Sequence, residues 1–594
     1  MPGRFAPFKW GLVATFAICI AHAAIAADPA KVFRIAFPTG ETGFDPARVS
    51  DLYSNEVNEA IFDRLLTYDY LARPAKLVPM AAEAMPEVTD NGRTYTFHLR
   101  KGVYFADDPA FKGRKRELVA QDFVYSYMRF VDPANRSPWA YMIDGHIEGL
   151  DAVTAAAKKS GKFDYDANVP GLQAPDRYTF RVKLAKADYL FPYTAAHVPM
   201  GAVAREVIEA YADDTMAHPV GTGPYMLKEW RRGARMVLEA NPGYRGFTWN
   251  FKAAEPEWDD KVVSDMQGKQ MPQIGRVEIT IIDEEQSRWL AFRQKQLDTL
   301  NVPGAFIFQA LTPDNKLQPA LAEEGIFLER TNDLDLTYST FNFRDPVVGG
   351  YTPDKIALRR AIIMGYRQEE ELRIVRKGQM VADQMPVPPG VLGFDRNYRA
   401  VDHYDPVTAN KLLDHFGYKR GADGYRTMPD GSPLVLKYAT GATAIEREFS
   451  ELWKKSMDDL GLHIDFIISK FADHLKAAKA CHLMMWGAAW IADYPDGEDF
   501  TQLLYGPNTG QSNNGCYESK AFDALYEAAA KLPLESVERM KLFIDMSRQM
   551  QVDGAWQVSG SRLRNQLIRP WVMGYKKHPI LQAEWMYLDV APHG

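Results

Sequence analysis

The stretch AMPEVTDNGRTYTFHLRKGVYF, residues 84–105, contains a strict alternation of apolar and polar side chains. Tyr95, Phe97 and Leu99 fall on one face, and the residues between them fall on the other. Because side chains of a β-strand point alternately to its two faces, this alternation predicts a half-buried strand. The segment RYTFRVKL, residues 177–184, repeats the pattern and predicts a second such strand.

Helical patterns are mixed among the strands. AQDFVYSYMRFVDP at 120–133 reads as a helix closed by proline, and YDPVTANKLLDHFGY at 404–418 begins with an Asp-Pro helix start. Residues 433–468 read as strand, helix, strand, which is a crossover unit. Residues 246–275 have no clear period and read as a long surface excursion. Strands and helices follow one another without a regular repeat, so the predicted class is α/β or α+β in several lobes.

The composition is that of a folded protein with more than one core. The chain has 594 residues, which predicts two or three lobes. Apolar residues make up 46% and charged residues 25%, a globular balance. The net charge of −7 comes from interspersed signs without a basic stripe, which argues against nucleic acid as a partner.

The N-terminus has the layout of a secretory signal peptide. Two basic residues precede a short apolar run, and small residues follow it, so residues 1–26 are the predicted signal and cleavage is expected between Ala26 and Ala27. The apolar run is too short for a permanent membrane helix. The mature protein is therefore expected to be exported and soluble, in the periplasm.

Cleavage would remove Cys19 and leave Cys481 and Cys516. In an oxidising compartment these two cysteines can pair or remain buried thiols, and the sequence leaves both readings open. No CxxC and no cluster of histidines accompanies them, so no zinc site is expected.

One acidic residue stands in an unusual place. In WIADYPDGEDF, residues 490–500, Asp493 directly follows an apolar run that contains Trp486 and Trp490. A carboxylate is costly to bury without a partner. Asp493 is therefore either a cap at the end of a strand or part of a pocket for a positively charged ligand.

Enzyme signatures are absent from the sequence. There is no GxSxG, HExxH or P-loop motif, and the acids of this segment do not have EF-hand spacing. Asp496, Glu498 and Asp499 are interpreted as a solvated turn at the start of a helix, where acids suit free N–H groups. The rival interpretation is a carboxylate pair for hydrolysis, but sequence neighbours rarely flank a substrate from both sides. No catalytic residue is assigned.

An ordered set of segments resembles the extracytoplasmic solute-binding proteins of ABC importers. The resemblance is to the peptide/nickel family (solute-binding family 5), and it is greatest to the oligopeptide-binding type. It runs from about Val32 to Val590. The segments that carry it, besides 84–105, are VAQDFVYSYMRFVDPANRSPWAYMIDGHIEGLDAV (119–153), GTGPYMLKEW (221–230), KIALRRAIIMGYRQEE (355–370), PVPPG (386–390), AFDALYEAA (521–529) and RPWVMGY (569–575).

The resemblance implies a periplasmic-binding-protein fold of class II, cluster C. Two lobes would close around a ligand, and an extra domain would be attached to the first lobe. The implied boundaries are lobe I at 27–62, 196–332 and 559–594, the extra domain II at 63–195, and lobe III at 333–558.

The resemblance also implies a ligand site. WIADY matches the family's Trp-x-x-Asp segment, so Asp493 would receive the free α-amino group of a bound peptide. Further implied ligand contacts are Trp490 as a wall of the site, Trp139, Phe471, and the backbone of Thr39, Gly40, Glu41 and Thr42. Plain packing is the competing interpretation for each of them.

Three positions depart from the family pattern. Oligopeptide binders hold the carboxylate of a short peptide with two arginines and a histidine, and these positions correspond here to Gly487, Ala478 and about Ala442. The amine end of the site is therefore retained, whereas the carboxylate end is not. Either the peptide is longer, or another cation holds its C-terminus, or the ligand is not a simple short peptide. We expect a ligand with a free amine and a bulky remainder.

The predicted function is delivery of peptides or peptide-like solutes to an ABC permease, with ATP hydrolysed by separate ATPase subunits. The chain would act as a monomer, without a cofactor or a metal and without catalysis. The alternatives are the same fold with a non-peptide ligand, such as haem, a nickel chelate or an opine-like compound, and an exported hydrolase. A chaperone or sensor of the same fold is a further alternative.

Overall fold

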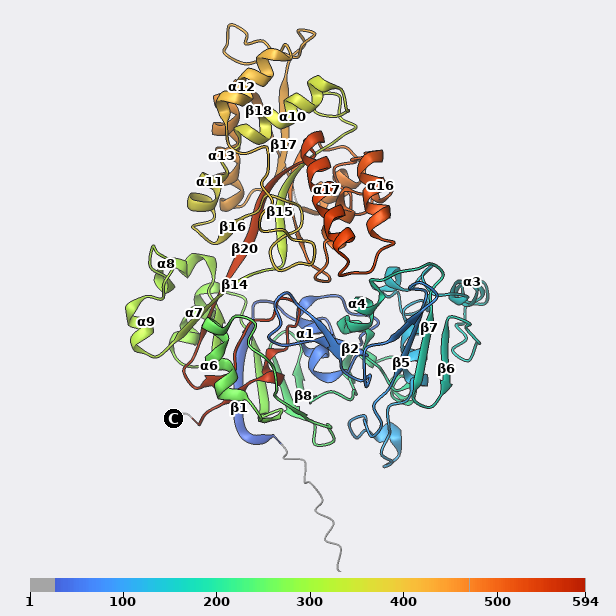
Figure 1. The fold of residues 1–594 in the computed structure, drawn as a ribbon. Coiled ribbons are helices and arrows are strands. Elements are labelled where there is room, and N and C mark those ends of the chain that lie inside the picture. Colours follow the sequence, from blue (N-terminus) through green and yellow to red (C-terminus); the bar gives the residue numbers. More distant parts are fainter. Residues whose placement is uncertain (1–26, 470, 593–594) are drawn as a thin grey trace, which may run out of the picture.

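The computed structural model describes residues 27–469 and 471–592, without the side chains of residues 257, 258, 444, 471 and 472. Its chain forms three bodies, two below and one above in Figure 1. The predicted signal peptide, including Ala26, lies outside the described residues. In the described part of the chain, no helix has both the length and the apolar character needed to cross a membrane.

We name the bodies after their sheets. Lobe I contains a four-stranded sheet in the order β1 (Asp28–Phe37), β12 (Ile274–Ile281), β9 (Arg235–Ala240) and β8 (Tyr225–Arg231). Domain II contains β4 (Glu87–Thr89), β5 (Thr94–His98), β7 (Thr179–Lys183) and β6 (Leu172–Asp176) in that order. Lobe III contains β15 (Asp335–Phe341), β19 (Met485–Ile491), β17 (Val435–Thr440) and β18 (His463–Ile468). The finer segment boundaries implied by the resemblance stay a prediction.

The sheet of domain II confirms the strand prediction. β5 and β7 pair antiparallel with Phe97 opposite Phe180, and both side chains are fully buried. Helix α2 (Ala120–Arg129) packs against β6 and β7, and its buried face comes from the apolar periodicity of that segment. The predicted helix at 404–418 is α12 (Pro406–His415), whose first turn is capped by Asp405.

Lobe III is a sheet covered on both faces. β17 and β18 are parallel and joined by α13 (Ala444–Leu460), which confirms the predicted crossover unit. One apolar cluster packs a sheet face against α10 (Pro353–Gly365) and α13. A second cluster packs the other face against α16 (Lys520–Ala529) and α17 (Val537–Asp553).

One long strand connects lobe III to lobe I. The first part of β20 (Trp556–Ile568) pairs with β15, and its last part pairs with β14 (Phe327–Asn332) and β13 (Thr299–Asn301). Figure 1 shows β20 running from the upper body into the lower left one. Ion pairs of Arg562 with Asp335 and of Arg564 with Asp333 lie where the strand passes between the bodies.

The segment 246–275 is more ordered than expected. It contains a two-stranded sheet, β10 (Phe247–Thr248) and β11 (Gln270–Met271), around helix α6 (Pro256–Met266). Trp249 is fully buried, and Lys576 pairs with Asp259 at 3.1 Å. The segment is a largely exposed excursion, and its contacts with the distant C-terminal region, from Trp249 to Tyr587 and from Asp259 to Lys576, hold it on the lobe.

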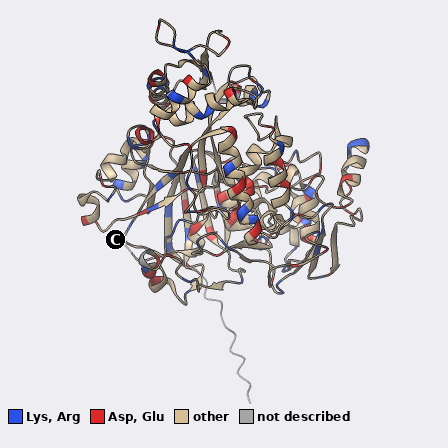
Figure 2. Cartoon of the chain, turned by 45° about the horizontal axis from the view of Figure 1, so that its top comes forward, with Lys and Arg blue, Asp and Glu red and all other residues tan. Residues whose placement is uncertain are grey.

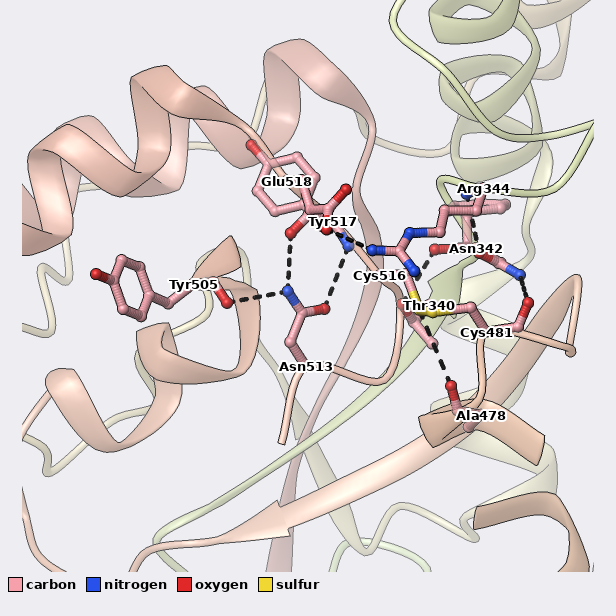
Figure 3. Close-up of a disulfide and its surroundings, with 11 residues drawn as sticks. Thr340, Asn342, Arg344, Ala478, Cys481, Tyr505, Asn513, Cys516, Tyr517 and Glu518 are labelled. Carbon is pink, nitrogen blue, oxygen red and sulfur yellow. Dashed lines mark hydrogen bonds and ion pairs between the residues drawn. A yellow bond between two sulfur atoms is a disulfide. The ribbon is translucent and has the colours of Figure 1, made fainter. Parts of the chain in front are cut away.

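The two cysteines left open by the sequence form a disulfide in this structure (Figure 3). Cys481 follows helix α14 (Phe471–Lys479), and Cys516 precedes α16, with a Cα–Cα distance of 6.0 Å. Asn342 donates to the Cys481 carbonyl at 2.7 Å, which attaches this crosslink to the end of β15. The disulfide therefore lies inside lobe III.

The remaining elements are short or peripheral. They include α1 (Leu52–Ile61), α3 (Leu150–Ser160), α4 (Phe191–Ala196), α5 (Arg205–Ala210), α7 (Glu285–Arg293), α8 (Ile307–Ala310), α9 (Pro319–Glu323), α11 (Gln368–Glu370), α15 (Glu498–Thr501), β2 (Leu66–Tyr68), β3 (Leu77–Pro79), β16 (Met380–Ala382), β21 (Val572–Met573) and β22 (Asp589–Val590). Lys and Arg are interspersed with Asp and Glu over the elements visible in Figure 2.

Candidate functional site

The acidic segment of residues 493–499 begins two residues after the end of β19. Along β19, Trp486 and Trp490 lie on the same face, because side chains two residues apart share a face of a strand. The strand ends at Ile491, and the chain then turns. The backbone N–H of Asp493 donates to Asp499 Oδ2 at 2.8 Å, which closes the turn. This geometry leaves the side chain of Asp493, and not its backbone, available to a guest.

Asp496 is buried and fully paired. Its two carboxylate oxygens accept from both terminal nitrogens of Arg539, at 2.6 and 2.7 Å. Asp496 and Asp499 are among the most buried side chains, with 0% and 1% exposure. The interpretation of these acids as a solvated turn was wrong. The partner that allows Asp496 to be buried lies on α17, too distant in the sequence to be recognised from the segment itself.

The other two acids next to Asp493 carry a cost of burial. Burial raises the pKa of Glu498 to about 7, while hydroxyl groups of Tyr494 and Tyr526 donate to its carboxylate. Burial, and then the charge of Asp493, raises the pKa of Asp499 well above its usual range. In the part of the chain that the structure describes, Arg539 forms the one ion pair of this four-acid segment. The segment therefore holds three acids without a cationic partner among the described residues, and burial favours the protonated form of each.

Asp493 itself has no donor. Burial raises the pKa of its carboxyl to about 6. Among the described residues, no hydrogen bond or ion pair reaches the carboxylate, although its own N–H is bonded. A cation that supplies both charge and hydrogen bonds stabilises the ionised form of a half-buried carboxylate that has no other donor. The arrangement is therefore suited to an ammonium group.

The segment faces domain II. Tyr494 stacks on Tyr193 of α4 with ring centroids 5.8 Å apart. Local desolvation, and then the charges of Asp493 and Asp499, raise the pKa of the Tyr141 hydroxyl, although this domain II side chain is 59% exposed. Sequence reasoning missed Tyr141. Its position two residues after Trp139 was the available signal.

Trp139 is anchored between two parts of the lower bodies. Its indole N–H donates to the Val49 carbonyl at 2.7 Å, and its ring meets His197 edge to face at 4.8 Å. The side chain is only partly buried. Trp139 therefore holds the segment of Tyr141 in place, whatever further contact it makes with a ligand.

The loop of residues 39–42 is fixed to lobe I through its side chains. Glu41 is buried and accepts from the Trp230 indole at 2.5 Å and from the Gly233 N–H at 3.0 Å. Gly40 lies against Gly233, where a Cβ would come within 3.2 Å of its Cα. Thr42 donates to Asp51 at 2.5 Å, and its backbone N–H donates to Ser54 Oγ at 3.0 Å. Thr39 is exposed, and among the described residues no hydrogen bond holds its side chain.

Two predicted aromatic contacts have different outcomes. Trp490 lies opposite Leu336 and packs against the apolar cluster beneath α16 and α17, so part of its surface serves the core. Phe471 is the first residue of α14, and its side chain lies outside the described residues.

Gly487, Ala478 and Ala442 are the positions at which oligopeptide binders hold the carboxylate of a short peptide, and the structure shows what surrounds each of them. The Tyr438 hydroxyl, bonded to Ser339 Oγ at 2.9 Å, occupies the space above Gly487, where a Cβ would come within 2.5 Å of it. Ala478 is buried beside the disulfide, and Ala442 is exposed just before α13. None of these three positions offers a cation. Within the described residues, no group of three or more His, Cys, Asp or Glu has a metal-holding arrangement.

Asp188 of domain II is an acid outside the segment 493–499 whose charge affects Glu498. Asp188 of domain II contributes to the raised pKa of Glu498, but its carboxylate accepts from the Leu190 N–H at 2.8 Å at the start of α4. Both acids therefore already have donors. This is unlike a pair of free carboxyl groups that flank a substrate.

Comparison with known proteins gives relatives over nearly the whole length. Residues 76–512 match the model of the bacterial extracellular solute-binding proteins, family 5. The chain is 24% identical to di/tripeptide-binding protein 2 of Pseudomonas aeruginosa, with 94% of this chain and 95% of the relative covered. It is 25% identical to the periplasmic oligopeptide-binding protein OppA of Escherichia coli, over 89% and 87%. It is also 24% identical to heme-binding protein A of Haemophilus influenzae, over 90% and 88%.

The fold is that of a solved relative. The periplasmic binding protein DppA of Helicobacter pylori, in complex with the peptide STSA, superposes with a TM-score of 0.67 at 20% identity, over 94% of this chain and 98% of that one. The fold and the match to more than half of the chain agree with the resemblance found in the sequence. The chain belongs to the bacterial extracellular solute-binding proteins, family 5.

Proposed function

We propose that this protein is the periplasmic solute-binding component of an ABC importer and that it takes peptides or peptide-like solutes with a free amino group. The observation that carries the proposal is the Asp493 carboxylate, which is half-buried beside Asp499 and receives no hydrogen bond from any residue that the structure describes. Peptide-binding relatives that cover about nine-tenths of the chain support the class of solute.

The chemistry of an α-ammonium group fits this carboxylate. A charge-assisted hydrogen bond contributes about 1.5–3 kcal/mol, more than a neutral one. In the described part of the chain, Asp496 is the one acid of this segment paired with an arginine, so a cation that enters beside Asp493 would also favour the ionised forms of the neighbouring acids. The hydroxyl of Tyr141 and the exposed loop backbone at Thr39 would provide further polar contacts. Water can fill the gaps between such contacts, so that many side chains are tolerated.

Binding would bring the bodies together rather than change the solute chemically. The chain passes between lobe I and lobe III along β20 and again where β14 connects to β15. A rotation of the lobes would therefore bend the chain at these two places. A ligand that contacts both bodies would favour the closed form by its differential affinity. The closed monomer would then dock on the permease, and separate ATPase subunits would supply the energy.

Export is part of the proposal. The signal peptide of residues 1–26 would be removed after Ala26, and the mature chain would work in the periplasm, where the Cys481–Cys516 disulfide is stable. This compartment agrees with the extracellular character of the family.

The test is capture of peptides by the mature protein. A random library of peptides two to five residues long is offered with free and with acetylated amino termini, and the captured peptides are identified by mass spectrometry. We expect wild-type protein to enrich the free amines and Asp493→Asn to lose at least about tenfold of that capture. Asp465→Asn, which removes an exposed acid of lobe III, is the matched control and should behave as wild type. Equal capture by Asp493→Asn, or equal capture of acetylated peptides, would refute the amine site.

The second candidate ligand is haem, favoured by the similarity to heme-binding protein A over most of both chains. Protein purified from its own periplasm distinguishes the two. A retained mass of one discrete compound with a Soret absorbance band supports haem, whereas a spread of masses that fragment as peptides supports the first proposal.

A further inference from the structure

A cavity of about 360 Å³ lies in lobe I, apart from the acidic segment of lobe III. Its walls come from β1, α1, the start of α7, the lobe I end of β20 and the C-terminal segment. In Figure 1, α1 lies on the side of lobe I that faces lobe III. The volume falls within the range of pockets that enclose small ligands, about 300–1,000 Å³. The cavity is therefore large enough for one end of a solute held between the bodies.

Glu56 is an acid of this cavity without a hydrogen-bond partner. It projects from α1, and among the described residues no donor reaches its carboxylate within hydrogen-bonding distance. Its neighbour Glu59 is different, because it pairs with Arg64 at 2.8 Å and accepts two backbone N–H groups. Burial, followed by the charge of Glu584, raises the pKa of Glu56 well above its usual range. A cation in the cavity would relieve this cost.

Two arginines that line the same cavity, Arg288 and Arg564, have N–H groups that donate no hydrogen bond to a described residue. Arg564 uses Nε and Nη2 on Asp333, at 3.0 and 3.4 Å. Arg288 uses Nη1 on the carbonyls of Ile282 and Asp283, both at 2.7 Å. In the described part of the chain, Arg564 Nη1 and Arg288 Nη2 have no acceptor. These two groups are available to an anion.

The three charged groups line the same cavity as Tyr53. Tyr53 lines the cavity, and the charges of Glu56, Arg564 and Arg288 all act on its hydroxyl, after the effect of burial. Lys577 and Glu584 also line the cavity but satisfy each other in an ion pair. Within the described residues, the lining therefore offers two carboxylates without an ion pair, Glu56 and Glu285, and two guanidinium edges, and together these groups can complement a zwitterion.

We propose that this cavity binds the C-terminal residue of the solute and favours a residue with a cationic side chain. The terminal carboxylate contacts Arg288 and Arg564, and the side-chain ammonium contacts Glu56. This assignment rests on the proposed amine site at Asp493. It supplies the anion contact that Gly487 and Ala478 do not offer. Because Asp493 and the cavity belong to different bodies, one solute that occupies both would also connect them.

The experiment uses the same peptide library, read by C-terminal residue. Wild-type protein is expected to enrich peptides that end in lysine over those that end in norleucine, and free acids over C-terminal amides, by about tenfold each. Glu56→Gln should abolish the preference for lysine and keep the preference for the free acid. Arg288→Gln should do the reverse. Glu284→Gln, an exposed acid at the start of α7 outside the cavity, is the matched control and should retain both preferences.

The outcomes separate this inference from the proposed function. Loss of capture in Asp493→Asn with no C-terminal preference in wild type overturns the cavity assignment and leaves the amine site standing. Unchanged lysine preference in Glu56→Gln also overturns it. Absence of any peptide capture by wild type removes both proposals. Where wild-type protein captures peptides, their length in residues, at about 3.3–3.6 Å per extended residue, measures the distance between Asp493 and the cavity.

Discussion

Both terminal nitrogens of Arg539 donate to the two carboxylate oxygens of Asp496, at 2.6 and 2.7 Å, and neither side chain has more than 2% exposure. The pair joins α17 to the turn after β19. Because Arg539 is engaged in this way, it does not neutralise Asp493. The negative charge that we assign to ligand binding therefore persists because a neighbouring acid has taken the available arginine.

Removal of Arg539 should destabilise the fold. Arg539→Met leaves Asp496 buried without its partner, which costs about 3–5 kcal/mol in the free energy of unfolding. Urea denaturation of the mature protein measures this loss. Arg548→Met is the control on the same helix, because its pair with Asp545 is exposed and should contribute less than about 1 kcal/mol. Equal effects of the two substitutions would contradict the role given to the Asp496 pair.

Binding of amines should weaken in acid. Burial raises the pKa of Asp493 from 3.8 to about 6, so the carboxylate is ionised above pH 6 and protonated below it. We expect the affinity for a free-amine peptide to fall below pH 6, by up to about tenfold per pH unit. Calorimetric titration between pH 5 and 8 measures this. In Asp493→Asn the remaining affinity should not show the Asp493 step, and an identical decline there would assign the proton to another group.

The stability of the ligand-free protein should change in the opposite direction. A carboxyl whose pKa is raised in the folded state holds its proton more tightly there than in the unfolded chain. Between pH 3.8 and about 6, the contribution of Asp493 to the free energy of unfolding therefore decreases as the pH rises. The difference between wild type and Asp493→Asn isolates this contribution in thermal melts. A difference that grows in favour of wild type across that window would contradict the raised pKa.

The disulfide should contribute substantially to lobe III. Its cysteines are 35 residues apart, and closing a loop of that length lowers the entropy of the unfolded chain by an amount worth about 4 kcal/mol. The double substitution Cys481→Ser with Cys516→Ser should lower the free energy of unfolding by up to that amount. Dithiothreitol should destabilise wild type similarly and leave the variant unchanged. An equal response of both proteins to the reductant would argue against the crosslink.

A side chain at position 487 should conflict with one hydroxyl. Gly487→Ala would place its Cβ about 2.5 Å from the Tyr438 hydroxyl, and overpacking of this kind costs about 1–3 kcal/mol. Tyr438→Phe removes the hydroxyl and its bond to Ser339, at a cost of about 1 kcal/mol. The double variant should be more stable than the sum of the two single losses predicts. Strict additivity in this cycle would show that the hydroxyl is not the obstacle.

Local patterns were sufficient for several elements. The alternation of Tyr95, Phe97 and Leu99 specified a strand, because a period of two puts one set of side chains into the core. The Asp405 start of α12 was equally legible, because an N-cap acts within three residues. The burial of Trp249 was missed, since it depends on the backbone of Tyr587, far away in the chain.

The candidate site was predictable only in part. Asp493 stood out because a carboxylate directly after an apolar strand is costly, and that cost can be read from neighbouring residues alone. The burial of Asp496 could not be read in the same way, because it depends on Arg539, which is 43 residues further along the chain.

The sequence by itself therefore determined the strands, the helix starts, the family resemblance and the single suspicious acid, all of which depend on residues close together in the chain or on their order. The tertiary structure decided which acid has a partner, which tyrosines face Asp493, what fills the space above Gly487, and that Glu56, Arg288 and Arg564 line one cavity. Those facts depend on distances between segments that are far apart in the chain, from 43 residues for Asp496 and Arg539 to several hundred for the walls of the cavity. Charge pairing and desolvation act through such distances, and no local pattern encodes them.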